Sequence, residues 1–96
     1  MRHLLLLRGR SGGLTNEQKA LIENAYRQLA DAVIGVNWVR VRYNCVARAQ
    51  NMDALVEIDL DGPETLTAYL EHPLHLELVR ESQPFLSAVV SFDYQQ

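Results

Sequence analysis

Two segments near the middle of the chain alternate their side chains between two faces, and this pattern constrains the fold most. Residues 36–46 place Val39, Val41 and Tyr43 on one face and Trp38, Arg40, Arg42 and Asn44 on the other. Residues 54–60 alternate in the same way, with Val56, Ile58 and Leu60 opposite Leu55, Glu57 and Asp59. A period of two is typical of half-buried strands. We therefore expect two antiparallel strands joined by a turn near residues 50–53.

The N-terminal part of the chain is expected to supply one more strand and a helix. The short apolar run from His3 to Arg8 favours a buried strand. Thr15 and Gln18 form a capping-box pattern that opens a helix, and Gly35 is placed to end it. The expected apolar stripe of this helix is Leu21, Ala25, Leu29 and Ala32.

A second helical region contains a proline that must interrupt it. Asp61 is placed to cap its start. Pro73 disfavours helical geometry at His72 and suits the first turn of a new helix. Residues 87–94 then alternate and are expected to form the last strand. The order indicates an α+β fold of the ferredoxin-like βαββαβ type, a four-stranded antiparallel sheet with helices on one face.

Such a fold, in a single domain over residues 1–96, has one sheet face under the helices and one outer face. We expect the covered face to hold Val39, Val41, Tyr43, Val56, Ile58, Phe92 and Tyr94. The opposite set mixes apolar and charged side chains: Leu4, Leu6, Arg8, Trp38, Arg40, Arg42, Leu55, Glu57, Asp59, Val89, Ser91 and Asp93.

An exposed apolar patch of that size usually marks an interface, although a solvated face is the alternative. We therefore expect a homodimer whose sheets pack face to face. Its interface is expected to include Leu4, Leu6, Trp38, Arg40, Arg42 and Glu57.

The segment Tyr69–His75 gathers a phenol and two imidazoles around the proline break. His75 would lie in the first turn of the new helix, where the helix dipole disfavours imidazolium. A neutral imidazole can act as a general base, and the Tyr69 hydroxyl can donate to a substrate oxygen. His3, on the same strand face as Leu5, is expected to point into the same space.

A small-molecule pocket between sheet and helices follows from this placement, with His3, Leu5, His72 and Tyr94 as ligand-binding residues. Each polar residue also has a structural alternative. His72 can cap the helix that begins at Pro73, Tyr69 can be a core aromatic, and His75 can be a first-turn residue without chemistry. No cysteine or carboxylate completes a metal set with these histidines, so neither a metal nor another cofactor is expected.

The charge and the cysteine content of the chain limit the kinds of partner and cellular compartment that are expected. The 96 residues carry a formal charge of −3 and one lysine, Lys19, so nothing resembles the basic footprint of a nucleic-acid-binding protein. The only cysteine, Cys45, cannot form an internal disulfide. The leucines near the N-terminus are too few for a signal peptide or a membrane span, and a cytoplasmic location is expected.

Nearly the whole chain resembles the stress-responsive α/β-barrel (Dabb) family. The resemblance rests on Arg2–Leu7, Ala54–Ile58, Ala68–His75 and Ser91–Tyr94, in that order. The Tyr-x-x-His-Pro-x-His element is the most specific of these. The resemblance implies a ferredoxin-like protomer and a dimer whose two sheets form a barrel.

Some members of this family are polyketide cyclases of the olivetolic acid cyclase type. They use a histidine base and a neighbouring tyrosine for an aldol ring closure without a cofactor. The resemblance places the base at His75, the phenol at Tyr69 and a pocket histidine at His3. These cyclases have a further pocket histidine near the start of the third strand, where this chain has Ala54.

Two functions stay open at this point. The first is a cofactor-independent enzyme, an aldol-type cyclase or related lyase, acting on a small hydrophobic or aromatic carbonyl compound. The second is a noncatalytic, stress-responsive dimer that binds a ligand or serves a structural role.

Overall fold

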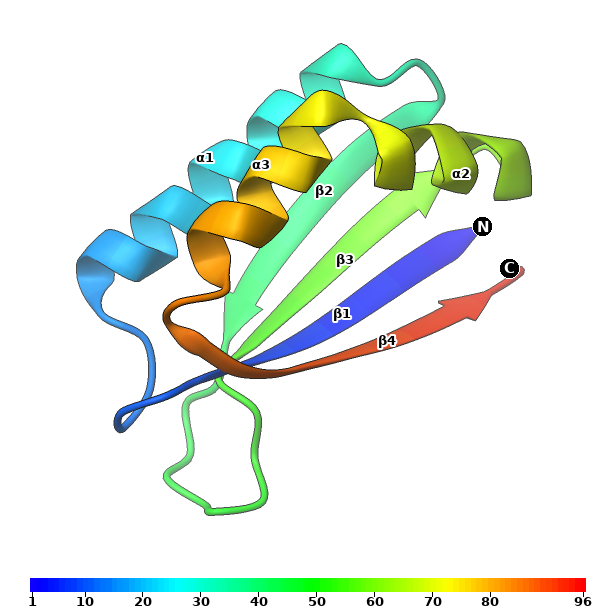
Figure 1. Ribbon diagram of the computed structural model, residues 1–96. Coiled ribbons are helices and arrows are strands. Elements are labelled where there is room, and N and C mark those ends of the chain that lie inside the picture. The colour runs from blue at the N-terminus through cyan, green and yellow to red at the C-terminus, as the bar shows by residue number, and fades with distance from the viewer.

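A computed structural model describes all residues 1–96 and shows one antiparallel sheet with three helices on one face (Figure 1). The elements in chain order are β1 (Arg2–Gly9), α1 (Asn16–Ala32), β2 (Val36–Tyr43), β3 (Ala54–Leu60), α2 (Pro63–Glu71), α3 (Pro73–Ser82) and β4 (Leu86–Tyr94). The strands lie in the order β2-β3-β1-β4, and all neighbours are antiparallel. The expected ferredoxin-like βαββαβ fold is confirmed. None of the helices is both long and apolar enough to cross a membrane.

The core lies between the central strands and the helices. Its best-buried side chains are Ile22, Leu29, Val56, Ile58, Leu60 and Tyr69. The capping box at the start of α1 is present, with the Thr15 hydroxyl accepting from the Gln18 backbone and the Gln18 side chain accepting from the Thr15 backbone. The buried stripe of α1 is Ile22, Tyr26 and Leu29, however, rather than one centred on Leu21 and Ala25, which are only partly buried. The buried face of α1 is thus displaced by about one residue from the expected face, and it includes Tyr26.

The register of β4 corrects the expected faces. Leu4 pairs with Phe92 and Leu6 with Val90, so Phe92 and Tyr94 lie on the outer face, away from the helices. The apolar row of this strand does not pack into the core because its pairing with β1 places it beside Leu4 and Leu6 on the outer face. Its helix-side row holds Val89, Ser91 and Asp93, which border an open cleft instead.

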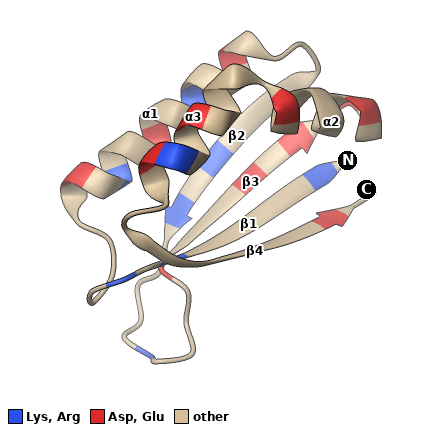
Figure 2. Ribbon diagram, in the orientation of Figure 1, with Lys and Arg blue, Asp and Glu red and all other residues tan.

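The outer face therefore carries a larger apolar patch than the sequence indicated. We define the outer-face patch as Leu4, Leu6, Trp38, Leu55, Val90, Phe92 and Tyr94. Phe92 is 64% exposed and Val90 is 53% exposed. Charges run beside the patch, basic on β2 and acidic on β3 (Figure 2). Arg42 pairs with Glu57 at 3.4 Å, whereas Arg40 stacks on the Trp38 ring at 4.3 Å.

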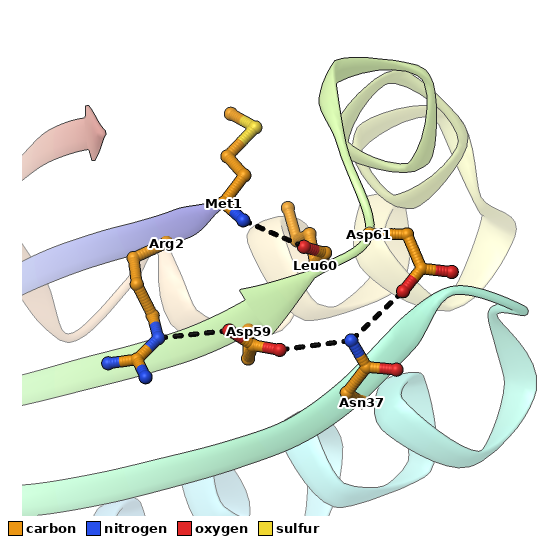
Figure 3. Close-up of polar contacts among 6 residues, drawn as sticks. All are labelled: Met1, Arg2, Asn37, Asp59, Leu60 and Asp61. Carbon is orange, nitrogen blue, oxygen red and sulfur yellow. Dashed lines mark hydrogen bonds and ion pairs between the residues drawn. The ribbon is translucent and has the colours of Figure 1, made fainter. Parts of the chain in front are cut away.

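Polar contacts tie β1, β2 and β3 together at one end of the sheet (Figure 3). The Arg2 guanidinium donates to Asp59 at 3.0 Å, and the Asn37 amide bridges Asp59 at 2.9 Å and Asp61 at 3.0 Å. Asp61 thus accepts from a neighbouring strand, and it does not cap α2. The N-cap of α2 is Gly62, which makes no side-chain capping bond.

Candidate functional site

A cleft of about 590 Å³ runs between α3 on one side and β1 and β4 on the other. Helix α3 lines it with His75, Leu78, Val79 and Ser82, and the strands line it with His3, Leu5, Leu7, Leu86, Val89, Ser91 and Asp93. The lining is apolar along its middle, with Arg10 and Gln83 at one end and His3, His75 and Asp93 at the other, which is the usual build of a small-molecule site.

The proline break brings the Tyr69 and His75 rings together at the end of the cleft that His75 lines. Helix α2 stops at Glu71, and His72 is extended, with φ −65° and ψ 138°. Pro73 then occupies the first position of α3. Because the chain turns at His72, Tyr69 in the last turn of α2 and His75 in the first turn of α3 come together, with ring centroids 4.8 Å apart.

His72 serves the helix break itself. Its Nδ1 accepts a hydrogen bond from the Leu74 backbone N–H at 3.1 Å, which caps α3. His72 is not among the residues that line the cleft. The structure therefore gives it the capping role that was the alternative to ligand binding.

His75 has a defined tautomer. Its Nδ1 lies 3.0 Å from the Leu70 carbonyl oxygen. A carbonyl only accepts, so Nδ1 carries the proton and Nε2 keeps its lone pair. Burial lowers the pKa of His75, and nearby His3 lowers it further, against the opposing effect of the Leu70 carbonyl. The expected neutral ring is thus supported, with burial as the largest cause.

Tyr69 is almost completely buried, with 1% exposed; its hydroxyl makes no hydrogen bond of good geometry, and the Tyr26 phenol is the polar group that interacts with it. Burial raises the pKa of Tyr69, and the adjacent Tyr26 phenol raises it further. The phenol is therefore neutral at pH 7 and has an O–H to donate. Buried hydroxyls without a well-formed hydrogen bond are uncommon in folded proteins, so this one is a candidate donor, although Tyr69 itself is not among the residues that line the cleft.

His3 completes the cluster from β1. It is 4% exposed, and its ring meets the Tyr69 ring edge-on with centroids 5.7 Å apart. Its Nδ1 contacts the Asp93 carboxylate on β4. Asp93 orients the His3 ring, as carboxylates orient histidines in many polar sites.

Two residues of this cluster escaped the sequence reading. The sequence pattern predicts Asp93 on the outer face, whereas the β1–β4 register places it opposite His3 on the helix side. Tyr26 lines the cleft from α1, and burial raises its pKa to about 12, against a smaller lowering by Tyr69. The sequence does indicate that Tyr26 is buried, because it lies four residues after Ile22 and three before Leu29, at the spacing of one helix face.

The two other predicted ligand-binding residues, Leu5 and Tyr94, lie on opposite faces of the sheet. Leu5 lines the cleft as expected. Tyr94, predicted as a ligand-binding residue, lies across the sheet on the outer face, paired with Arg2. No group of three or more histidine, cysteine, aspartate or glutamate side chains is arranged to hold a metal ion.

The whole of residues 1–96 matches the family model of the stress responsive A/B barrel domain, Dabb. Among curated proteins, none matches the chain.

Solved structures share the fold. A dimeric ferredoxin-like protein of unknown function from Thermobifida fusca is 26% identical, covers 99% of this chain and 89% of its own, and has a TM-score of 0.83. A Dabb family protein from Mesorhizobium loti is 20% identical over 99% of this chain and 94% of its own, at a TM-score of 0.78. The hydroxynitrile lyase from Passiflora edulis is 20% identical over 97% of this chain and 89% of its own, at a TM-score of 0.80.

Proposed function

This chain belongs to the stress responsive A/B barrel domain family, Dabb, and we propose that its cleft carries out cofactor-independent acid/base chemistry on a small carbonyl compound. The observation that carries the proposal is the pairing of two unsatisfied groups. His75 presents a free Nε2 because Nδ1 is held by Leu70, and the adjacent Tyr69 hydroxyl is buried with no well-formed hydrogen bond, beside the Tyr26 phenol.

The two groups fit complementary parts of one proton transfer. The His75 Nε2 takes a proton from the carbon next to the carbonyl, and the electron pair moves onto the carbonyl oxygen. The Tyr69 hydroxyl donates to that developing oxyanion. The enolate carbon then attacks a second carbonyl of the same molecule, and the imidazolium returns its proton to the resulting alkoxide. In a lyase reaction the same base removes a proton from a hydroxyl group, the hydroxyl oxygen forms a carbonyl as the bond from its carbon to the leaving group breaks, and the imidazolium gives its proton to the departing anion.

His3 and Asp93 act as positioning residues in this scheme. The carboxylate holds Nδ1 of His3, which fixes the orientation of a ring packed edge-on against Tyr69. The position where the related cyclases carry another histidine is Ala54 here, and this alanine is buried in β3. Because Ala54 cannot make the polar contact that a histidine makes in those cyclases, the substrate of this protein is expected to differ from the cyclase substrates at that contact.

Similar folds lend the proposal support without fixing the reaction. The Passiflora edulis neighbour is a hydroxynitrile lyase, so one protein with this fold is a lyase. At 20% identity this likeness extends to the fold only. The choice between cyclase-type and lyase-type chemistry rests on the substrate.

We also propose that the protein is a homodimer through its outer face. The outer-face patch exposes Phe92, Val90 and Leu6 side by side, and apolar surface of this kind commonly marks an interface. The Thermobifida fusca neighbour is dimeric. Packing two such sheets face to face would bury the patch and leave both clefts on the outside of the dimer.

A noncatalytic dimer is the second candidate, and the outer-face patch favours it equally. The two candidates differ in what His75 does. In the noncatalytic dimer the cleft binds a ligand by packing, and the free Nε2 is never used as a base.

Deuterium exchange separates the two. Acetophenone in D₂O exchanges its methyl protons slowly, and NMR follows the loss of the methyl signal. The acid/base proposal predicts faster exchange with the wild-type protein and a loss of about a hundredfold or more in His75→Asn. His72→Asn is the matched control, because asparagine also caps helices and the residue lies outside the cleft. Equal exchange in wild type and His75→Asn would reject the proposed base.

A further inference from the structure

The cleft carries a cation at the end opposite to His75. Arg10 directly follows β1, and its side chain lines the cleft beside Gln83. Its Nε donates to the Pro84 carbonyl at 3.0 Å, and its Nη2 donates to the Gln83 carbonyl at 3.4 Å. Its backbone N–H donates to the Phe85 carbonyl at 3.0 Å. These bonds fix the guanidinium to the turn between α3 and β4.

No carboxylate of the chain pairs with this guanidinium. The side-chain contacts between basic and acidic groups involve Arg2, His3 and Arg42, and none involves Arg10. Arg10 is the only arginine or lysine that lines the cleft, and Asp93 is the only acid. Nη1 makes no hydrogen bond within the chain, so the Nη1–Nη2 edge remains available to a ligand.

The two charged ends are separated by an apolar floor and wall. These are built from Leu5, Leu7, Leu78, Val79, Leu86 and Val89. His3 and Gly9 mark the two ends along β1, and six strand residues at about 3.3 Å each span roughly 20 Å. A ligand that meets both ends must be elongated and mostly apolar.

We propose that the cleft takes an elongated apolar carbonyl compound with a carboxylate at the end remote from the reacting carbonyl, and that Arg10 binds this carboxylate. The inference rests on the proposed function, because the opposite end is assigned to the reacting carbonyl.

Charge sets the direction in which such a ligand lies. Asp93 would repel a carboxylate placed beside His3, whereas the unpaired Arg10 attracts one. The planar guanidinium edge matches a carboxylate with two parallel hydrogen bonds. Because the Gln83 and Pro84 carbonyls already hold the side chain, little further side-chain freedom is lost on binding.

Octanoate and 1-octanol test the assignment, since they share a chain and differ in charge. Binding is followed by NMR of the Leu7 and Leu86 signals, near the Arg10 end of the cleft, in wild type, Arg10→Gln and Arg80→Gln. Arg80 is an exposed arginine of α3 that does not line the cleft, which makes it a matched control. We expect the wild type to prefer octanoate by about tenfold, and Arg10→Gln to lose that preference. Arg80→Gln should keep it.

A second measurement needs no variant. If Arg10 binds the carboxylate, added salt should weaken octanoate binding to the wild type and leave 1-octanol binding nearly unchanged. Equal binding of the two probes, or a preference that survives Arg10→Gln, would overturn the carboxylate assignment. Either result would leave the acid/base proposal standing, because that proposal is tested with neutral acetophenone.

Discussion

His3 and Asp93 face each other across β1 and β4, and the carboxylate contacts Nδ1 of the ring. The contact joins residues 90 positions apart in the chain. It sits beside Tyr69 and His75, so it links the sheet to the two helices that meet at Pro73.

Replacing Asp93 with alanine is expected to release the His3 ring while the fold remains. The carboxylate selects the tautomer with the proton on Nδ1, and this selection disappears in Asp93→Ala. ¹⁵N NMR of His3 measures the tautomer directly. We expect acetophenone exchange to fall by about tenfold through loss of positioning. An unchanged His3 spectrum would contradict the contact.

Tyr69→Phe separates stability from activity. The hydroxyl is buried with no well-formed hydrogen bond, so its removal relieves an unfavourable desolvation. We expect the free energy of unfolding to stay equal or to rise by about 1 kcal/mol, as urea denaturation would show. Acetophenone exchange should nevertheless fall by about tenfold or more, because the oxyanion loses its donor. A clear loss of stability would mean that the hydroxyl has a structural partner.

The fold was largely predictable because its signals are local. Alternation in residues 36–46 and 54–60, the capping box at Thr15 and the break at Pro73 each depend on a few neighbouring residues. The juxtaposition of Tyr69 and His75 was predictable for the same reason, since only one extended residue separates their helices.

Long-range register was not readable in this way. The faces of β4 depend on its pairing with β1, and both rows of that strand contain apolar residues. The rule that the more apolar row enters the core fails for an edge strand beside an open cleft. This one error moved Phe92 and Tyr94 to the wrong face and hid the partnership of Asp93 with His3.

Acid is expected to affect His75 in a defined window. Its folded pKa lies below the usual value of about 6.5, so the unfolded chain binds the proton more readily. Stability is therefore highest above about pH 6.5, declines as the pH falls from about 6.5 towards the folded pKa, and stays at the lower level below the folded pKa. His75→Asn should lack this component in urea unfolding at matched pH values. The same shift predicts that exchange activity persists below pH 6.5; a half-point above 6.5 would contradict it.

Asp59 should contribute stability with the pH dependence of a carboxylate. The Asn37 amide, then Arg2, holds the pKa of Asp59 below its usual range. This contribution is fully present above the unfolded pKa of about 3.9 and is lost as the pH falls through the folded value. Asp59→Asn is thus expected to be destabilised at pH 7 and to approach wild type in strong acid. Asp31→Asn, an exposed change on α1, serves as the control in the same urea series.

The outer-face patch predicts where self-association can be broken. Phe92→Asp places a charge at the most exposed aromatic side chain of the patch. In a symmetric dimer the substitution is present on both sides of the interface. We expect sedimentation to show dimer association weakened, with the Kd of the dimer raised by about a hundredfold or more. Ile34→Asp is the matched control, because Ile34 is 98% exposed in the turn between α1 and β2. A monomeric wild type at micromolar concentration would reject the dimer.

¹⁵N NMR of His75 tests the central claim most directly, in the wild-type protein with and without acetophenone. The account predicts a protonated Nδ1 and a lone pair on Nε2 at pH 7, and a selective shift of Nε2 when the ketone is added. A proton on Nε2 in the free protein, or an unchanged ring at saturating ketone, would contradict the assignment of His75 as the base of this cleft.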